Sequence, residues 1–328
     1  MTAISYHDTI DDLQDLDWSG SGPFARPSWF ALLEKTVEAP LYATARQGVQ
    51  AVTLPLRQSG RHLEALTNWY AFTWSDLHTG GPSDAALLED LARALATRTP
   101  RVTLTKLPEE DRTLDRLRTA FRDAGWAVFA QPCDTNHVLE VGGRSFSQYL
   151  ADRPGPVRTT LQRKAKKVDV TLSTMFEPDV WSAYEAIYAD SWKPKEGDPD
   201  LLRAFAQSES KAGRYRFALA RHEGAPVAAQ FWTVDGDTAY IHKLAHRKTA
   251  DHLSPGTTLT AALFERVIDT DKVARVDFGT GDDPYKRDWM EQVRTRWRLD
   301  CLRPENPRNW PVFVRAIARK LVSRRQRG

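Results

Sequence analysis

The chain has 328 residues, which is enough for two domains of about 150 residues each. Hydrophobic residues make up 41% and charged residues 27%, as in soluble globular proteins, and no apolar run approaches the roughly 18–20 residues that a membrane span needs. The N-terminus has no basic segment followed by an apolar one, so we expect no secretory signal. Cys133 and Cys301 lie far apart, outside any metal-like spacing, which predicts reduced structural thiols in the cytoplasm and no metal site.

The first half of the chain alternates between helical and strand-like patterns. Pro27 precedes an apolar-periodic run, and Gly48 and Gly60 supply turns between strand-like segments. We expect helices at 28–37, 84–96 and 109–124, and strands at 41–46, 49–57, 62–66, 101–106, 126–131 and 137–141.

The second half follows the same order of elements. We expect helices at 145–150, 157–168, 178–192, 199–213, 258–270 and from about 284, and strands at 170–176, 215–222, 225–234, 238–246, 275–278 and 296–302. The two halves share no literal sequence repeat, so we infer a duplicated architecture and not a duplicated sequence. The prediction is an α/β (mixed-sheet) protein with domains at 1–143 and 144–328.

A candidate anion site lies at the N-terminus of the helix expected at 258. The segment LSPGTTLTAALFERVI, residues 253–268, brings Gly256 and the hydroxyls of Ser254, Thr257 and Thr258 to the start of that helix, and Arg247 lies just upstream. A helix N-terminus has unpaired N–H groups and a positive dipole end, which suit a phosphate. The alternative is an ordinary cap beside a solvated basic turn.

The next strand leads into a second polar segment, VDFGTGDDPYKRDWM, residues 276–290. Asp277 lies at the end of a buried strand, Tyr285 and Lys286 follow it, and all three lie near the expected phosphate loop, where they suit proton transfer. The segment lacks the GxGxxG dinucleotide fingerprint. The alternative is an acidic helix start at Asp282–Pro284.

Four segments together resemble the GNAT superfamily of acyltransferases. They are RTTLQRKAKK, GAPVAAQFWTVDGDTAYIHKLAH, LSPGTTLTAALFERVI and DFGTGDDPYKRDWM, the last being the most distinctive. The chain is most similar to the CelD-like or BioF-like acetyltransferase subgroup, which is related to the FemAB peptidyltransferases. The resemblance implies tandem GNAT-like folds with acyl-CoA as the donor. The superfamily's usual Arg/Gln-x-x-Gly-x-Gly/Ala loop is reduced here to Gly256, so an acyl carrier protein stays an alternative donor.

The resemblance also implies a mechanism in which an amine attacks the thioester directly between splayed central strands. Within that scheme we assign His242 as the base, Asp277 as its orienter or an alternative base, Tyr285 as the acid, and Lys286 as a positioning group. His242 and Lys243 are expected on opposite faces of their strand. The alternative for His242 is a core or interface histidine.

Two further features bear on the substrate. Residues 158–167, RTTLQRKAKK, form a basic helix that is either a solvated face or the entry for an anionic donor. An aromatic loop is assigned to an apolar substrate groove or, alternatively, to core packing. The assigned substrate-binding residues are Trp69, Tyr70, Trp74, Gln230 and Trp289.

The C-terminal region is strongly basic. From Arg294 onward eleven basic residues face two acidic ones, so the first 293 residues carry a net charge of −6 in a chain of net charge +3. Apolar residues recur on one helical face from Trp310 to Leu321. The alternatives are a helix docked on the body and an interfacial helix on anionic lipid at the inner membrane. Sequence-specific nucleic-acid binding is not expected.

The leading hypothesis is therefore an acyl-CoA-dependent N-acyltransferase, with a small-molecule or lipid amine as acceptor. Similarity to bacterial ceramide synthases points to a sphingoid base. The alternatives are a FemAB-like transferase that uses aminoacyl-tRNA and a non-catalytic GNAT-like module in exopolysaccharide or lipid assembly.

Overall fold

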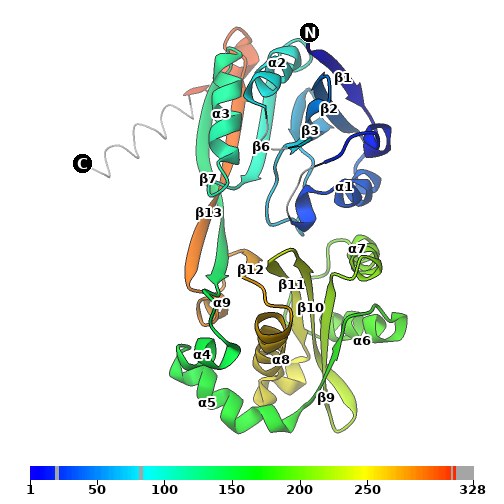
Figure 1. Ribbon diagram of the computed structural model, residues 1–328, viewed down its shortest axis with the longest axis vertical. Helices are drawn as coiled ribbons and strands as arrows, with labels where there is room; N and C mark the ends of the chain where they lie inside the picture. The colour runs from blue at the N-terminus through cyan, green and yellow to red at the C-terminus, as the bar shows by residue number, and fades with distance from the viewer. Residues whose placement is uncertain (19–21, 81–83, 312, 315–328) are drawn as a thin grey trace, which may run out of the picture. The chain divides into compact units, whose positions relative to one another are not determined.

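The computed structural model describes residues 1–18, 22–80, 84–311 and 313–314. Its contacts divide the described chain into two compact units (Figure 1). The described residues of the N-terminal unit are 1–18, 24–80, 84–134, 295–311 and 313–314. Those of the C-terminal unit are 22–23 and 135–294. No helix among the described residues has the length and apolar character to cross a membrane.

The N-terminal unit is a mixed sheet with helices. Its strands are β1 (Ala3–His7), β2 (Pro40–Gln47), β3 (Gln50–Ser59), β4 (His62–Ala65), β5 (Leu77–His78), β6 (Arg101–Leu107) and part of β13 (Gln292–Leu302). Its α-helices are α1 (Pro27–Leu33), α2 (Ala85–Leu95) and α3 (Thr113–Asp123). The strand order is β1-β2-β3-β4-β6-β13, with β5 beside β3, and β4–β6 is a parallel pair.

The C-terminal unit repeats this plan. Its strands are part of β7 (Ala127–Glu140), β8 (Asp169–Ser173), β9 (Tyr215–His222), β10 (Ala225–Asp235), β11 (Thr238–His246) and β12 (Arg275–Thr280). Its α-helices are α4 (Phe146–Ala151), α5 (Gly155–Lys164), α6 (Pro178–Ala189), α7 (Pro199–Lys211), α8 (Pro255–Glu265) and α9 (Pro284–Arg287). The strand order is β7-β12-β11-β10-β9-β8, and β11–β12 is a parallel pair. In both units an antiparallel meander therefore precedes a helix and a parallel strand.

Each unit takes one strand from the other half of the sequence. Residues 297–302 of β13 pair antiparallel with β6, and residues 136–140 of β7 pair antiparallel with β12. The expected boundary at 143/144 therefore differs from the contact division, which places residues 295–302 in the N-terminal unit. The reason is the sheet pairing of β13, which the linear order of elements does not show.

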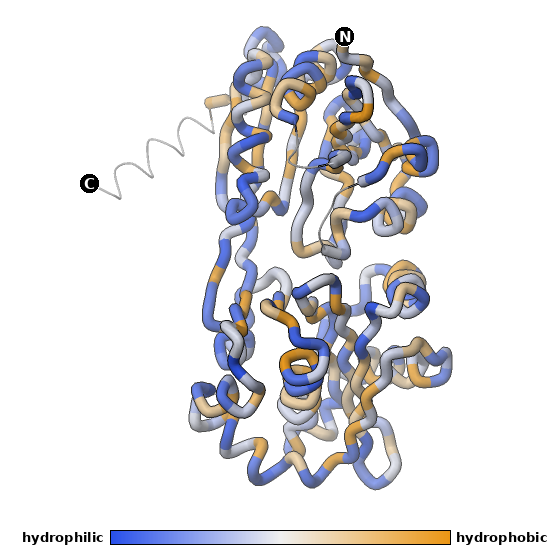
Figure 2. The backbone as a smooth tube through the Cα atoms, in the orientation of Figure 1, coloured by the Kyte–Doolittle hydropathy of each residue, from blue (hydrophilic) through white to orange (hydrophobic). Residues whose placement is uncertain are grey.

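Helices cover both faces of the C-terminal sheet. Phe231 packs against Trp181 of α6 and Phe205 of α7, whereas its neighbour Trp232 packs against Phe264 of α8. Successive side chains of a strand point to opposite faces, so α6 and α7 lie on one face and α8 on the other. Figure 2 shows the apolar character of α8, which is buried on most sides, beside the largely hydrophilic α5.

A β-bulge interrupts β11 at His242. Trp232 pairs with Ile241 but Phe231 pairs with Lys243, so β11 has one extra residue. The expectation that His242 and Lys243 point to opposite faces is therefore wrong. The His242 ring contacts Phe205 and Phe231, and Lys243 lies over the Tyr188 ring of α6, so both side chains lie on the α6/α7 face.

Candidate active site

The central parallel strands of the C-terminal unit separate after a short pairing. β11 and β12 pair only over three residues, from Thr238↔Arg275 to Tyr240↔Asp277. Beyond that point, within the described residues, the two strands no longer pair with each other, as expected for splayed central strands. A cavity of about 510 Å³ lies in this unit. It is lined by Pro156, Val157, Thr160, Trp192, Leu244, His246, Asp251, Ser254, Gly256, Thr257, Thr260, Tyr285, Asp288 and Trp289.

The first turn of α8 forms one wall of this cavity. Ser254 precedes the helix in the left-handed region, with φ of 50°, and its side chain makes no capping hydrogen bond. Pro255 has no N–H, so the N–H groups of Gly256 and Thr257 begin the helix. A Cβ on Gly256 would lie 3.4 Å from Leu244 Cδ1 and 3.6 Å from His246 Nδ1. The glycine thus brings the helix backbone close to β11.

Two polar side chains fix the position of that turn. The Gln230 side chain of β10 is fully buried and donates to the Gly256 carbonyl at 3.1 Å and to Thr260 Oγ1 at 2.6 Å. Lys164 of α5 donates to Ser254 Oγ at 3.0 Å. The basic α5 therefore reaches the start of α8, and its Thr160 lines the cavity.

A histidine and two carboxylates also line the cavity. His246 Nε2 lies 2.7 Å from Asp251 Oδ1, and the buried Nδ1 has no hydrogen-bond partner among the described residues. Burial lowers the pKa of His246, against an opposing contribution from Asp251. Trp192 packs on the same ring, with centroids 4.2 Å apart. Asp288 is the second carboxylate of the lining.

Tyr285 lines the same cavity as the first turn of α8, which places it where an acid beside the donor is expected. Burial, and to a smaller extent Asp283, raise the pKa of its hydroxyl. The ring packs edge-on against Phe278 of β12, with centroids 5.6 Å apart. The hydroxyl therefore stays protonated at physiological pH.

His242 does not line this cavity. Its Nε2 lies 2.8 Å from Thr233 Oγ1, and its ring is surrounded by aromatic side chains. Burial, followed by the charge of Lys243, lowers its pKa to about 3. The structure therefore favours the core-histidine alternative, because the bulge turns the ring into the α6/α7 face.

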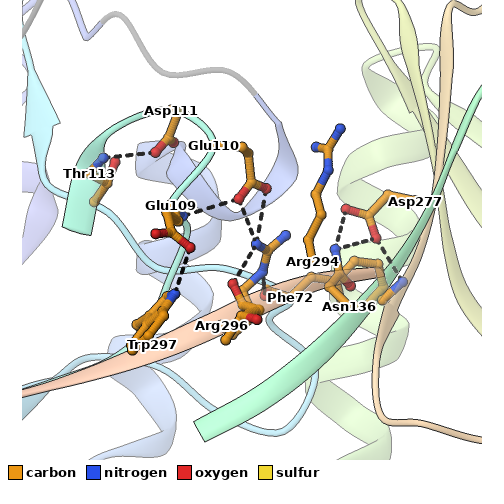
Figure 3. Close-up of polar contacts among 12 residues, drawn as sticks. Phe72, Glu109, Glu110, Asp111, Thr113, Asn136, Asp277, Arg294, Arg296 and Trp297 are labelled. Atoms are coloured by element: carbon orange, nitrogen blue, oxygen red, sulfur yellow. Dashed lines mark hydrogen bonds and ion pairs between the residues drawn. The ribbon is translucent and has the colours of Figure 1, made fainter. Parts of the chain in front are cut away.

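Asp277 and Lys286 hold the turn after β12. Asp277 accepts from Asn136 Nδ2 at 2.9 and 3.1 Å (Figure 3). It also accepts from the Gly279 N–H at 2.7 Å. Lys286 Nζ is buried and donates to the carbonyls of Gly279 and Thr280, at 3.3 and 2.5 Å. Neither side chain lines the cavity, and the contacts of both hold the turn, whereas the sequence assigned Asp277 to proton transfer and Lys286 to positioning a phosphate or substrate.

Two of the expected phosphate ligands also lie outside the lining. Arg247 forms an ion pair with Asp190 and donates to the Pro226 carbonyl at 3.0 Å. Thr258 is buried in the helix, and its Oγ1 has no partner among the described residues. Ser254, Gly256 and Thr257 line the cavity as expected.

The expected substrate residues have different surroundings. Trp289 lines the cavity and stacks on Phe264, with centroids 5.2 Å apart, whereas Gln230 is the buried anchor of α8. The aromatic loop belongs to the N-terminal unit, where Trp74 is buried and donates to the Pro55 carbonyl at 3.1 Å. Tyr70 is also buried, but Trp69 is 74% exposed. Core packing therefore accounts for Trp74.

Sequence reasoning missed several lining residues. Trp192 lies in the loop between α6 and α7, and Thr160 lies on a helix that was considered only for its charge. His246 ends β11 directly before the phosphate-sized loop, and this position was a signal for preferring it to His242. The extra residue of the bulge had no signature in the sequence.

The comparisons with known proteins agree with this architecture. The family model described as "Acetyltransferase (GNAT) domain" matches residues 143–287. No curated protein matches the chain.

Several solved structures share the fold over nearly the whole chain. FemX has a TM-score of 0.62 at 8% identity, covering 90% of this chain and 96% of its own. The C-terminal domain of a candidate lysylphosphatidylglycerol synthetase from Agrobacterium fabrum has a TM-score of 0.61 at 11% identity, covering 94% and 95%. A tandem GNAT protein from the clavulanic acid biosynthesis pathway has a TM-score of 0.50 at 13% identity, covering 91% and 98%. This chain therefore has a tandem GNAT-like acyltransferase fold, and its residues 143–287 are similar to the acetyltransferase (GNAT) domain family.

Proposed function

We propose that this protein is an N-acyltransferase whose C-terminal unit binds an acyl thioester of a phosphopantetheine carrier, with acyl-CoA as the donor. The observation that supports this proposal most is the shared cavity of Thr257 and Tyr285. The N–H groups that begin α8 suit a phosphate, and the separated edges of β11 and β12 offer backbone groups to an extended pantetheine arm.

The chemistry follows from this arrangement. The acceptor amine attacks the thioester carbonyl carbon, the C–N bond forms, and the C–S bond breaks. The tyrosine hydroxyl of Tyr285 donates a proton or hydrogen bond to the departing thiolate. Its raised pKa keeps that proton in place at physiological pH. A backbone N–H on the splayed part of β11 stabilises the oxyanion of the tetrahedral intermediate.

We propose an amine as the acceptor, with a long-chain amine as the leading candidate. The basic tail from Arg315 onward lies outside the described residues, and its proposed contact with an anionic membrane would bring such an acceptor to the protein.

A second candidate is aminoacyl transfer from a charged tRNA. It is favoured by the basic side chains of α5 and the segment after it, of which Lys164 reaches the cavity rim. FemX and the lysylphosphatidylglycerol synthetase domain are also more similar in fold to this chain, with TM-scores of 0.62 and 0.61, than the clavulanic acid pathway protein, with a TM-score of 0.50. The two candidates differ in the size and charge of the donor.

The donor can be identified by ligand-dependent stability. CoA at 100 times its dissociation constant should stabilise the folded protein by about 2.7 kcal/mol, which a thermal-shift assay detects. Total tRNA should then give no gel-mobility shift at physiological salt. Intact-mass analysis of products from a panel of acyl-CoAs and amines, including sphingoid bases, identifies the acceptor. A tRNA shift without CoA stabilisation would establish the second candidate, and neither response would favour a non-catalytic module.

A further inference from the structure

A lysine outside the expected site lies beside the cavity. Trp192 and Lys193 belong to the segment between α6 and α7, and Trp192 lines the cavity. Lys193 Nζ lies 5.7 Å from the centre of the Trp192 ring. Among the described residues it has no hydrogen bond or ion pair.

Lys243 and Glu196 are close enough to this amine to affect its pKa. Lys243, next to the β11 bulge, forms a 2.8 Å ion pair with Glu196, and both side chains are largely buried. Tyr184 of α6 donates to the same carboxylate at 3.3 Å. The Glu196 carboxylate therefore has two partners other than Lys193, namely the Lys243 ammonium and the Tyr184 hydroxyl.

Burial and like charge both favour the neutral form of Lys193. Burial is the larger cause, and Lys243 and Lys286 add to it, whereas Asp283 and Glu196 oppose it. The result is a pKa of about 8. The charge of Lys193 in turn contributes to the lowered pKa of His246, a lining residue, so the amine lies within electrostatic range of the cavity.

We propose that Lys193 is a catalytic residue that accepts the proton of the acceptor amine, and that the Lys243–Glu196 pair is its positioning partner. This inference rests on the proposed function. Lys193 is not itself a lining residue, but its amine lies 5.7 Å from the ring of the lining residue Trp192, whereas His242 Nε2 lies against Thr233 in the aromatic core.

The step balances without another reactant. Neutral Lys193 Nζ removes one proton from the acceptor nitrogen as the C–N bond forms and becomes an ammonium. The electron pair of the broken C–S bond stays on sulfur, which receives the proton of Tyr285. Transfer of a proton from Lys193 to the tyrosinate, directly or through solvent, restores both groups.

The test begins with the amine itself. The full-length protein is labelled with trace acetic anhydride between pH 6 and 11, and peptide masses report the reaction of each lysine. We expect Lys193 to react half-maximally near pH 8 and, at pH 7.5, roughly tenfold faster than the neighbouring Lys195. Saturating CoA should protect Lys193 but not Lys195. A reactivity of Lys193 that follows that of Lys195 across the pH range would overturn the inference.

Two variants separate this inference from the proposed function. K243M should move the labelling midpoint of Lys193 upward, because it removes a like charge and the ion-pair partner of Glu196. K193M should keep the CoA thermal shift but lower kcat for product formation at least tenfold, with the limb near pH 8 lost from the rate profile. Unchanged kcat in K193M would refute the role of Lys193. Absence of a CoA shift in the wild type would refute the proposed function, while the labelling midpoint would still report on the amine.

Discussion

Among single residues, Tyr285 lies at the junction of the cavity and the turn held by Asp277 and Lys286. Tyr285→Phe keeps the ring contact with Phe278 and removes only the hydroxyl. We expect kcat for acyl transfer to fall by about 10²-fold, because a positioned acid contributes roughly 10²–10⁴-fold. Steady-state kinetics check this, with the CoA thermal shift as the control. A kcat within twofold of the wild type would exclude the hydroxyl from the reaction.

The buried His242 makes a prediction about stability and pH. Its pKa is about 3 in the folded state, below the ordinary value of 6.5. Between these values the unfolded chain binds a proton that the folded chain does not, so stability falls as pH falls below about 6.5. The maximal slope for one group is about 1.4 kcal/mol per pH unit. Above pH 6.5 this group has no effect.

Urea unfolding at pH 7, 6 and 5 measures this effect. His242→Gln can keep a hydrogen bond to Thr233 and removes the titrating group. We expect the loss of stability between pH 7 and 5 to be smaller in this variant than in the wild type. Equal losses in both proteins would show that His242 is not the titrating group.

At the level of elements, the function depends on how close α8 approaches β11. Gly256→Ala places a methyl group in ordinary contact with Leu244 and His246, and alanine favours a helix over glycine by about 0.5–1 kcal/mol. We therefore expect unfolding stability to be unchanged or slightly higher. The CoA affinity should fall about tenfold, because the methyl group lies among the cavity-lining residues.

Calorimetric titration of CoA and urea unfolding together check this prediction. Thr257→Ala provides a matched comparison, since it removes a lining hydroxyl without adding volume. Reduced stability of Gly256→Ala with unchanged CoA affinity would mean that the glycine serves only helix–strand packing.

For the whole molecule, each unit depends on a strand from the other half of the sequence. β6 pairs with residues 297–302, and β12 pairs with residues 136–140, so each unit is incomplete without the other half of the sequence. The strand β13 contributes fully buried Leu299, Cys301 and Leu302 to the N-terminal unit. In the same unit the buried Arg296 side chain pairs with Glu110 (Figure 3).

Fragments cut at 143/144 test this organisation. We expect residues 1–143 and 144–328 to be insoluble or poorly structured when each is produced alone, because in 1–143 β6 loses its pairing with β13 and in 144–328 β12 loses its pairing with β7. Co-production should restore a soluble complex with the far-ultraviolet circular dichroism of the intact protein. Two fragments that each fold cooperatively alone would contradict the dependence of each unit on a strand from the other half.

Local sequence patterns predicted most of the elements. The meander of the C-terminal unit was expected at 215–222, 225–234 and 238–246, and β9, β10 and β11 lie within one residue of these bounds. Apolar periodicity and Gly or Asp turns encode such strands directly. By contrast, the strands expected at 126–131 and 137–141 form one continuous β7, which runs through Asp134.

The sequence by itself determined the order of elements, the GNAT resemblance, the small residues before α8 and the position of Tyr285 after β12, since all of these follow from residue type and local spacing. Only the tertiary structure decided which polar side chains meet. One extra residue in β11 turned His242 into the aromatic core, long-range hydrogen bonds fixed Asp277 on Asn136, and packing brought Trp192 to the cavity. Such contacts depend on pairing register and burial between distant segments, which local patterns do not encode.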